Sequence, residues 1–271
     1  MREIQTLDIN MKNILAVGAG KMGSAFIDEA RKSGYLVGVF DPYEEQHYVD
    51  LSDLLSKQQK LTGQLKPIIA DFTLPDAFMK NIDLYAEYGM NAVVGTTGWF
   101  ADPKKLQYVK DKVNEAGIGL IYAGNYSLGV QATYFALNAL SEFLGKVGGF
   151  DTYIIEEHHT NKADSPSGTA VEMAKVIMKN MPNKTEILIG NSPDKIKPEQ
   201  LQVLSSRFSK VFGTHLAAFE DDNQRIEISH RSDSRSHFAQ GAVQAIEFIR
   251  GKKGLFTMQD FIKEKFIENS K

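Results

Sequence analysis

The chain has 271 residues, of which 42% are hydrophobic and 24% charged, with a formal net charge of −3. This composition excludes a fibrous or disordered chain, and the small net charge gives no electrostatic reason to expect nucleic acid or a membrane as a partner. The absence of cysteine excludes disulfides, thiolate catalysis and cysteine-ligated zinc. No apolar run approaches the ~20 residues that span a bilayer, and the first residues do not form a signal peptide. We therefore expect a cytoplasmic protein of about two domains.

The first half of the chain alternates apolar strands with helices. Residues 1–10 are polar and without a clear period, so they are expected to be an extension. Strands are predicted within 12–20, 35–41, 67–73, 91–98 and 117–127, and helices at 22–33, 77–88 and 103–116. Thr73 and Asp76 have the spacing of a capping box at the second helix. Five short strands separated by helices predict a Rossmann-type, doubly wound parallel sheet.

The pattern changes after Asn125. A long helix is predicted at 127–144, a strand at 152–159, a helix from Thr169 to Asn180 with a Thr169–Glu172 capping box, and a final helix at 238–250. Strands at 203–208, 214–220 and 225–231 follow one another without helices between them. We therefore expect a second, α+β domain with a mixed or antiparallel sheet.

A dinucleotide fingerprint lies between the first predicted strand and the first helix. It has the form G-x-G-x-x-G and comprises Gly18, Ala19, Gly20, Lys21, Met22 and Gly23. Asp41 ends the next strand, where an acid accepts hydrogen bonds from a ribose 2′-hydroxyl. A glycine turn in a ligand-free domain is the alternative, and the coincidence of motif, context and acid favours a nucleotide.

Asp41 also favours NADH over NADPH, because a carboxylate repels a 2′-phosphate. The residues that follow it, Pro42 and Tyr43, include no arginine. Lys21 or Arg31 remains available to a phosphate, so both cofactors stay open.

Small and polar residues follow the later strands of the predicted parallel sheet. Ligands of open parallel sheets bind beyond the carboxyl ends of the strands, so these turns are expected to contact the cofactor. Strand termination is the alternative for any single turn. The residues are Thr73, Gly95, Thr96, Thr97, Ala123, Gly124, Asn125 and Tyr126.

The densest polar stretch runs from residue 156 to residue 169. It offers His158 as a proton donor, Lys162 as a cation, and a helix start at Ser167, Gly168 and Thr169 that suits a carboxylate. This combination fits a small carboxylate substrate reduced by hydride. A solvated loop with an ordinary helix cap is one alternative. A metal site is the other, but no H-E-x-x-H spacing exists and adjacent strand residues diverge, so no metal is predicted.

Arg235 lies in a second basic stretch, residues 230–237. It is expected to reach a substrate carboxylate or to act at the return between domains. A charged surface loop is an equally good interpretation.

These motifs together resemble the 4-hydroxy-tetrahydrodipicolinate reductase family, formerly called dihydrodipicolinate reductase, of bacterial lysine and diaminopimelate synthesis. The most specific is EEHHTNKADSPSGTA at 156–170, close to the E-x-H-H-x-x-K-x-D-A-P-S-G-T-A of the family. DFTLPDA, GTTG, AGNYSLGV, GTH and SHRSDSRSHFAQGAV also fit. The resemblance runs from about Asn13 to the last helix.

The resemblance implies a reaction and the residues that perform it. NADH or NADPH reduces the cyclic imine that forms from 4-hydroxy-tetrahydrodipicolinate as water leaves. His158 is implied as proton donor and acceptor and Lys162 as proton donor, while His159, Ser167, Gly168 and Thr169 hold the carboxylates of the dicarboxylate substrate. The cofactor is held by the fingerprint, Asp41 and the turns after the later strands.

The resemblance also implies an organisation. The dinucleotide-binding domain comprises residues 11–126 and 236–271 and includes the C-terminal helix. A substrate-binding and oligomerisation domain, residues 127–235, is inserted between its two parts. The protein is expected to be a homotetramer assembled through the sheet of the inserted domain. Two other functions stay open: a related two-domain amino-acid dehydrogenase of the aspartate or diaminopimelate type, and a non-catalytic NAD(H)-sensing module.

Overall fold

The computed structural model describes residues 13–41, 50–58 and 66–268. The chain divides into two compact units. The first contains the described residues of Met1–Ser127 and Ser236–Lys271, and the second is Leu128–Arg235. The extension expected at residues 1–10 lies outside the described residues. None of the described helices combines the length and the apolar character needed to cross a membrane.

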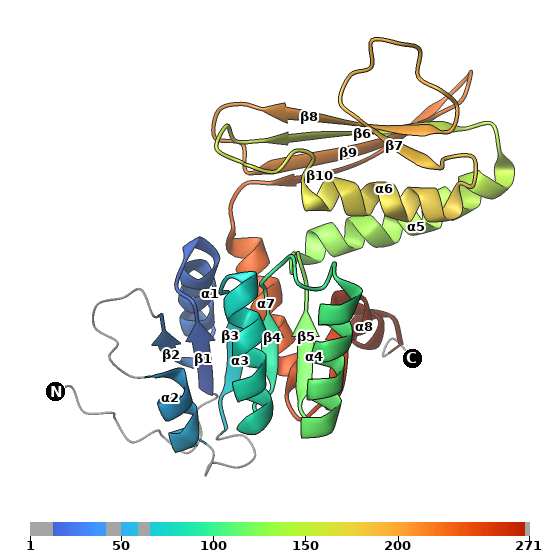
Figure 1. Ribbon diagram of the computed structural model, residues 1–271. Helices are drawn as coiled ribbons and strands as arrows, with labels where there is room; N and C mark the ends of the chain where they lie inside the picture. The colour runs from blue at the N-terminus through green and yellow to red at the C-terminus, as the bar shows by residue number, and fades with distance from the viewer. Residues whose placement is uncertain (1–12, 42–49, 59–65, 269–271) are drawn as a thin grey trace. The chain divides into compact units, whose positions relative to one another are not determined.

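The first unit is built on a six-stranded sheet in which every pairing is parallel (Figure 1). Its order is β11-β5-β4-β3-β1-β2. Five of the strands are the predicted ones: β1 (Asn13–Val17), β2 (Leu36–Phe40), β3 (Ile68–Asp71), β4 (Ala92–Val94) and β5 (Gly119–Tyr122). The sixth, β11 (Gly254–Thr257), pairs with β5 and was not anticipated.

Helices cover both faces of this sheet. One face carries α2 (Leu51–Gln58), α3 (Pro75–Glu87) and α4 (Pro103–Ala116), and the other carries α1 (Lys21–Lys32) and α7 (Ser236–Ile249). The core under α3 and α4 is built around fully buried aromatic side chains, including Phe78, Tyr85 and Trp99. After β11 the chain continues into α8 (Met258–Ile262) and the π-helical turn η2 (Lys263–Glu268). The Rossmann-type arrangement predicted from the sequence is confirmed.

Two predicted helix caps are wrong. Leu74 is the N-cap of α3, with Pro75 at the first helical position, and the Thr73 hydroxyl donates to the Asp71 carboxylate instead. Helix α6 (Gly168–Asn180) is capped by Ser167, whose hydroxyl accepts a hydrogen bond from the Ala170 N–H. The helix therefore starts one residue before the predicted Thr169.

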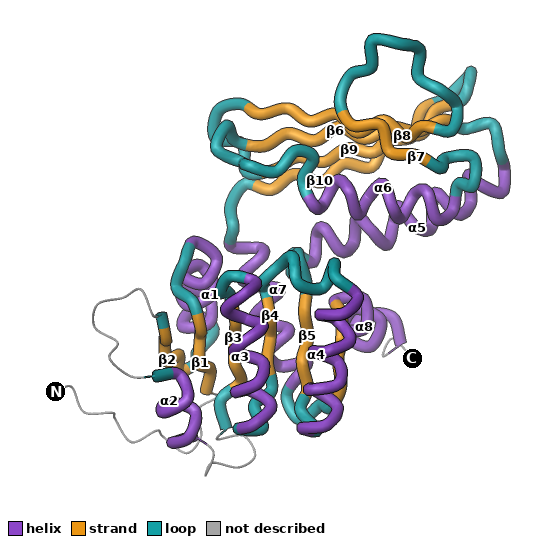
Figure 2. Tube along the Cα trace, in the orientation of Figure 1, coloured by secondary structure: helices purple, strands orange, loops and turns teal. Residues whose placement is uncertain are grey.

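The second unit is a five-stranded mixed sheet covered on one face by α5 (Leu128–Val147) and α6 (Figure 2). Its order is β10-β9-β6-β8-β7. Strands β6, β8 and β7 run parallel, and β9 pairs antiparallel with β6 and β10. The strands are β6 (Asp151–His158), β7 (Glu186–Ile189), β8 (Gln200–Arg207), β9 (Gly213–Glu220) and β10 (Arg225–Ser232).

Strand β6 is central to this sheet and alternates strictly in burial. Ile154, Glu156 and His158 occupy its buried face, and Ile155 and Glu157 point to the opposite side. Ile154 packs in a core with α5 and α6. The same alternation that buries Ile154 therefore carries a carboxylate and an imidazole to the end of the strand on the helix-covered face.

Candidate functional site

The fingerprint glycines lie where the strand order of the first unit reverses. From β1 the chain continues to β2 on one side, while β3 lies on the other side of β1. Gly18 follows β1 with a φ of +90°, and a Cβ there would lie 3.0 Å from the Phe72 carbonyl carbon. Ligands of open α/β sheets bind at such a switch point. The tight turn and the approach of the β3 loop both require the glycine.

The other two glycines have different surroundings. A Cβ on Gly23 would lie 2.0 Å from the Gly18 carbonyl oxygen, so this position admits only glycine without rearrangement. A Cβ on Gly20 would meet nothing within 4 Å. The open space at Gly20, directly before α1, fits a pyrophosphate that binds free backbone amides at a helix N-terminus.

Asp41 holds the glycine turn from the end of β2. Its Oδ2 accepts a hydrogen bond of 2.6 Å from the Ala19 N–H. Lys21 and Met22 are the first two residues of α1, and the Lys21 side chain is exposed. The turn, the acid and the helix start therefore lie together as the fingerprint predicts. Pro42 and Tyr43 lie outside the described residues.

Asp71, a residue that sequence reasoning missed, joins the turns after β3 and β4. Its carboxylate is fully buried and accepts from the Thr73 N–H at 2.8 Å and from the Thr73 and Thr96 hydroxyls at 2.6 and 3.3 Å. Tyr85 and Asn81 of α3 donate to its other oxygen. Asp71 therefore fixes Thr73 and Thr96 against each other. The sequence signal that could have identified Asp71 is an acidic residue at the end of a buried strand.

The remaining predicted cofactor residues line the same edge of the sheet. Gly95 allows the Phe72 ring to pass, since a Cβ there would lie 2.4 Å from that ring, and Gly124 faces the Thr97 methyl group. Thr97 and Gly124 are exposed, whereas Ala123 is buried and Asn125 is partly exposed. The Tyr126 hydroxyl is buried and donates to the Val94 and Ile121 carbonyls. Tyr126 therefore has only its backbone to offer a ligand.

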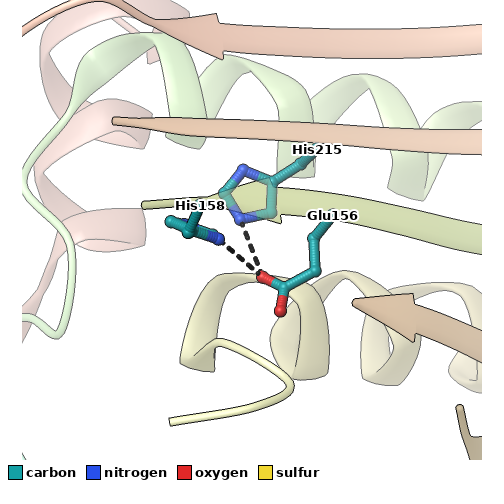
Figure 3. A group of neighbouring side chains, drawn as sticks. All are labelled: Glu156, His158 and His215. Carbon is teal, nitrogen blue, oxygen red and sulfur yellow. Dashed lines mark ion pairs between the residues drawn. The ribbon is translucent and has the colours of Figure 1, made fainter. Parts of the chain in front are cut away.

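In the second unit, Glu156 and His158 form the centre of a buried polar cluster (Figure 3). Glu156 Oε1 accepts hydrogen bonds from the Ser167 N–H at 3.0 Å and from Arg207 Nη2 at 2.7 Å. His158 Nδ1 lies 3.1 Å from Glu156 Oε2, close enough for an ion pair but not aligned as a hydrogen bond. His215 Nε2 lies 3.7 Å from the same oxygen and 3.1 Å from the Ser167 hydroxyl.

The pKa values of this cluster move with burial and with its donors. Burial by itself raises the pKa of Glu156, but the contacts from His158, Ser167, Arg207 and Ser205 outweigh it and hold the pKa well below its usual range. Burial lowers the pKa of His215 to about 3, and the neighbouring His158 adds to the effect. Glu156 is therefore an anion and His215 a neutral base at neutral pH.

Lys162 lies in the loop between β6 and α6. Its Nζ donates to Asp164 Oδ1 at 2.7 Å. Burial alone raises the pKa of Asp164, but its hydrogen bond and charge interaction with Lys162 lower it overall. Arg207 also reaches this loop, because its Nη2 donates to the Asp164 carbonyl. One guanidinium therefore links the Lys162 loop to Glu156.

The predicted carboxylate-binding residues follow that loop at the start of α6. Ser167 is buried and bonded into the cluster, and Gly168 is exposed with open space around its Cα. The Thr169 side chain hydrogen-bonds with Tyr134 of α5, and His159 is partly exposed. His158 at the end of β6, Lys162 in the loop and the start of α6 therefore follow one another along the chain, and Arg207 links the loop to Glu156. Arg235 contacts the Phe212 ring, 5.6 Å from its centroid.

The donor atoms of Glu156, His158 and His215 lie within 4.8 Å of one another. Arg207 already shares the Glu156 carboxylate, and a guanidinium there disfavours a second cation. That no metal is bound stays a prediction.

Comparison with known proteins gives the family. The N-terminal profile of dihydrodipicolinate reductase matches residues 12–126, and its C-terminal profile matches residues 129–262. The chain belongs to the dihydrodipicolinate reductase family.

Relatives of the family match over almost the full chain. The 4-hydroxy-tetrahydrodipicolinate reductase of Ralstonia pickettii is 32% identical over 268 residues, which is 93% of this chain and 99% of the relative. That of Christiangramia forsetii is 34% identical, covering 94% and 99%. A dipicolinate-bound dihydrodipicolinate reductase from Paenisporosarcina has the same fold, with a TM-score of 0.68 at 21% identity over 91% of this chain and 97% of that one. The family predicted from the motifs is confirmed.

In the second unit, sequence reasoning did not assign Glu156, Arg207 and His215. Each comes from a different strand: β6, β8 and β9. The register pairs Glu156 with Ser205 on one side and with His215 on the other. Their meeting depends on strand order, which no local pattern in the sequence specifies.

Proposed function

We infer that this protein is an NAD(P)H-dependent oxidoreductase that reduces 4-hydroxy-tetrahydrodipicolinate, with loss of water, to tetrahydrodipicolinate in lysine and diaminopimelate biosynthesis. The near-full-length match to reductases of that name carries the inference. The alternatives, an amino-acid dehydrogenase and a non-catalytic sensor, are not favoured. A solved reductase of the same fold holds dipicolinate, which supports a small dicarboxylate as the substrate here.

We propose that the first unit binds the cofactor, at positions 18–23, Asp41, Thr73, 95–97 and 123–126. The open Cα of Gly20 and the amides at the start of α1 suit its pyrophosphate. When bound, the nicotinamide supplies a hydride to the substrate. We further propose NADH as the preferred donor, since the Asp41 carboxylate sits beside the turn, 2.6 Å from the Ala19 nitrogen.

The second unit, in this proposal, binds the substrate and moves the proton. The start of α6, with Ser167, Gly168, Thr169 and His159, holds the carboxylates, and Arg235 adds a positive charge. His158 and Lys162 deliver the proton that balances the hydride. A donor held on a rigid strand end loses little freedom when the substrate binds.

We also propose that the protein works in the cytoplasm as a homotetramer. Reduced nicotinamide nucleotides are regenerated there by metabolism. Aliphatic residues on the sheet face of the second unit that lies away from α5 and α6 support assembly through that sheet.

The activity is tested by mixing the purified protein with NADH and freshly prepared substrate. The nicotinamide absorbance is expected to fall, and His158→Ala and Lys162→Ala are each expected to lower kcat by about 10²–10⁴-fold. NADH affinity should be unchanged in both, because the fingerprint lies in the other unit. Lys179→Ala, an exposed lysine on α6, is the matched control. Equal rates in all variants, or oxidation of NADH only with ammonia and an oxo acid, would refute the assignment.

Cofactor preference is tested by removing the Asp41 charge and adding an arginine two residues later in the sequence. Asp41→Ala combined with Tyr43→Arg should raise the NADPH/NADH ratio of kcat/KM by about tenfold or more, because a repulsive charge is replaced by an attractive one. Tyr43→Arg alone separates the attraction from the loss of Asp41. An unchanged ratio in the double variant would refute the role given to Asp41.

A further inference from the structure

The two oxygens of the Glu156 carboxylate have different surroundings. The side chain is completely buried. Oε1 accepts hydrogen bonds from Arg207 and from the Ser167 backbone, at 2.7 and 3.0 Å. Oε2 faces two imidazoles, with His158 Nδ1 at 3.1 Å and His215 Nε2 at 3.7 Å (Figure 3). Oε1 is thus bound by Arg207 and the Ser167 backbone, whereas Oε2 faces the two histidines.

Charged and titratable groups face His158 from every element around it. Glu156 lies on its own strand, and the loop that follows contributes Lys162, paired with Asp164. Strand β8 contributes Arg207, directly opposite His158 in register and bonded to Glu156. Strand β9 contributes His215, whose ring centroid is 5.1 Å from that of His158, and β10 contributes His230 opposite His215. Among these groups, the carboxylate in contact with the His158 ring is Glu156.

The two ring nitrogens of His158 are therefore in different environments. Nδ1 faces the Glu156 anion, and Nε2 lies by Gly213, where an added Cβ would be 2.9 Å from it. A carboxylate beside Nδ1 determines which ring nitrogen is turned outward, because the partner of one nitrogen sets the role of the other. A neutral His215 adds no competing positive charge beside the ring.

We propose that Glu156 is a positioning residue for the reduction: it orients His158 through Nδ1, and it ties this donor to the start of α6. The proposal rests on the proposed function, in which His158 gives a proton and α6 holds a substrate carboxylate. The same carboxylate contacts the His158 ring and the Ser167 N–H. The proton donor and the carboxylate cradle therefore keep a fixed spacing.

The test is Glu156→Gln, which removes the charge and keeps the shape. The ring nitrogen signals of His158, assigned by their loss in His158→Gln, are followed by NMR in the free enzyme and report which ring nitrogen carries a proton. In the wild type, Nδ1 is expected to carry a proton towards the carboxylate. This preference should weaken in Glu156→Gln, because an amide offers a donor as well as an acceptor. At neutral pH, kcat should fall at least tenfold, with KM for the substrate changing less.

Glu157→Gln is the matched control, because Glu157 is the next residue on β6 and points to the opposite side of the sheet. It should leave both the His158 ring signals and kcat unchanged. Unchanged His158 ring signals in folded Glu156→Gln would overturn the proposal, as would an equal change in Glu157→Gln. If Glu156→Gln does not fold, Glu156→Asp keeps the charge but moves it one methylene away from the ring, and it should still change the His158 ring signals and lower kcat. No change in Glu156→Asp would overturn the proposal as well.

The NMR measurement needs no substrate, so it separates this proposal from the proposed function. A wild-type protein that does not turn over the substrate counts against the function alone. Changed His158 ring signals in Glu156→Gln together with an unchanged kcat would show that the orientation of His158 does not matter for the reduction, and would overturn the positioning role.

Discussion

His215 is a base in a place that disfavours its charge. It is 5% exposed, beside the Glu156 carboxylate and the His158 ring. Burial is the largest cause of its lowered pKa, and it outweighs the attraction of Glu156. The ring therefore stays neutral in the folded protein at pH values where the unfolded chain would protonate it.

This difference predicts a loss of stability in acid. The pKa of His215 falls from 6.5 in the unfolded chain to about 3 in the folded protein, so the unfolded chain takes up the proton first as pH falls below about 6.5. The free energy of unfolding should drop by about 2 kcal/mol between about pH 7.5 and pH 5 through this residue, and the loss continues until about pH 3. Denaturant unfolding of wild type and His215→Gln at the two pH values measures it.

The comparison isolates His215 because the other groups are common to both proteins. Glu156, whose pKa is lowered, contributes stability that is complete above about pH 4.5 and is lost only in stronger acid. The stability difference between wild type and His215→Gln should therefore narrow, or change sign, towards pH 5. A difference that stays constant with pH would contradict a buried, neutral ring.

At the residue scale, the sequence predicts His158 and Lys162 as proton donors but does not predict the residues that surround them. His158, Lys162 and Ser167 stand within ten residues of one another, so a motif captures them. Glu156 stands in the same motif, yet its role depends on Arg207 and His215, about 50 to 60 residues away and joined to it by strand pairing. Nothing local in the sequence encodes that pairing.

At the element scale, the glycine turn separates two kinds of requirement. Gly23 is needed by the fold, since a Cβ there would overlap the Gly18 carbonyl oxygen at 2.0 Å. Gly20 has open space at its Cα and no positive φ. The open space at Gly20 is therefore available to a ligand that binds from outside the protein.

Gly20→Ala should therefore mainly lose nucleotide affinity, whereas Gly23→Ala should mainly lose stability. Gly20→Ala is expected to keep its unfolding free energy within about 1 kcal/mol, since exposed sites tolerate such changes, and to weaken NADH binding at least tenfold because the new methyl group occupies the approach of the pyrophosphate. Gly23→Ala is expected to lose about 1–3 kcal/mol through overpacking. Thermal unfolding and calorimetric titration with NADH measure both. Equal nucleotide affinity in Gly20→Ala and wild type would contradict this use of the fingerprint.

The elements that the sequence predicted are those with a long or regular pattern. Strands β1, β3, β4 and β5 bury nearly every side chain, and β2 is an apolar run despite its partial exposure, so apolar runs reveal all five. Strands β7 and β11 are four residues each and lie at sheet edges, with partly exposed side chains, and α2 is a short helix rich in serine and charge. Such segments become strands or helices because they pair with a neighbouring strand or pack on a core. This tertiary context is not visible in the local sequence.

At the scale of the whole molecule, α5 and α6 cover one face of the second sheet, and none of the described helices of the second unit covers the other face. Leu204 and Leu216 flank Ile155 in register on β8 and β9. Their neighbours Ile154, Val203 and Ala217 are buried in the core with α5 and α6, so alternation turns the three aliphatic side chains to the other side. All three are partly exposed. An aliphatic row across three strands is a suitable centre for an interface between copies.

The proposed homotetramer can be tested at the middle of this row. Leu204→Lys adds a charge that an interface would have to desolvate, at a cost of several kcal/mol for each copy, so the mass measured by light scattering should fall to that of a dimer or a monomer. Gln107→Lys, an exposed residue of α4 in the first unit, makes the same charge change away from the sheet and should leave the mass unchanged. Circular dichroism checks that the dissociated variant keeps its strands. A Leu204→Lys protein with the mass of a tetramer would place the interface elsewhere, and a wild-type monomer would exclude the assembly itself.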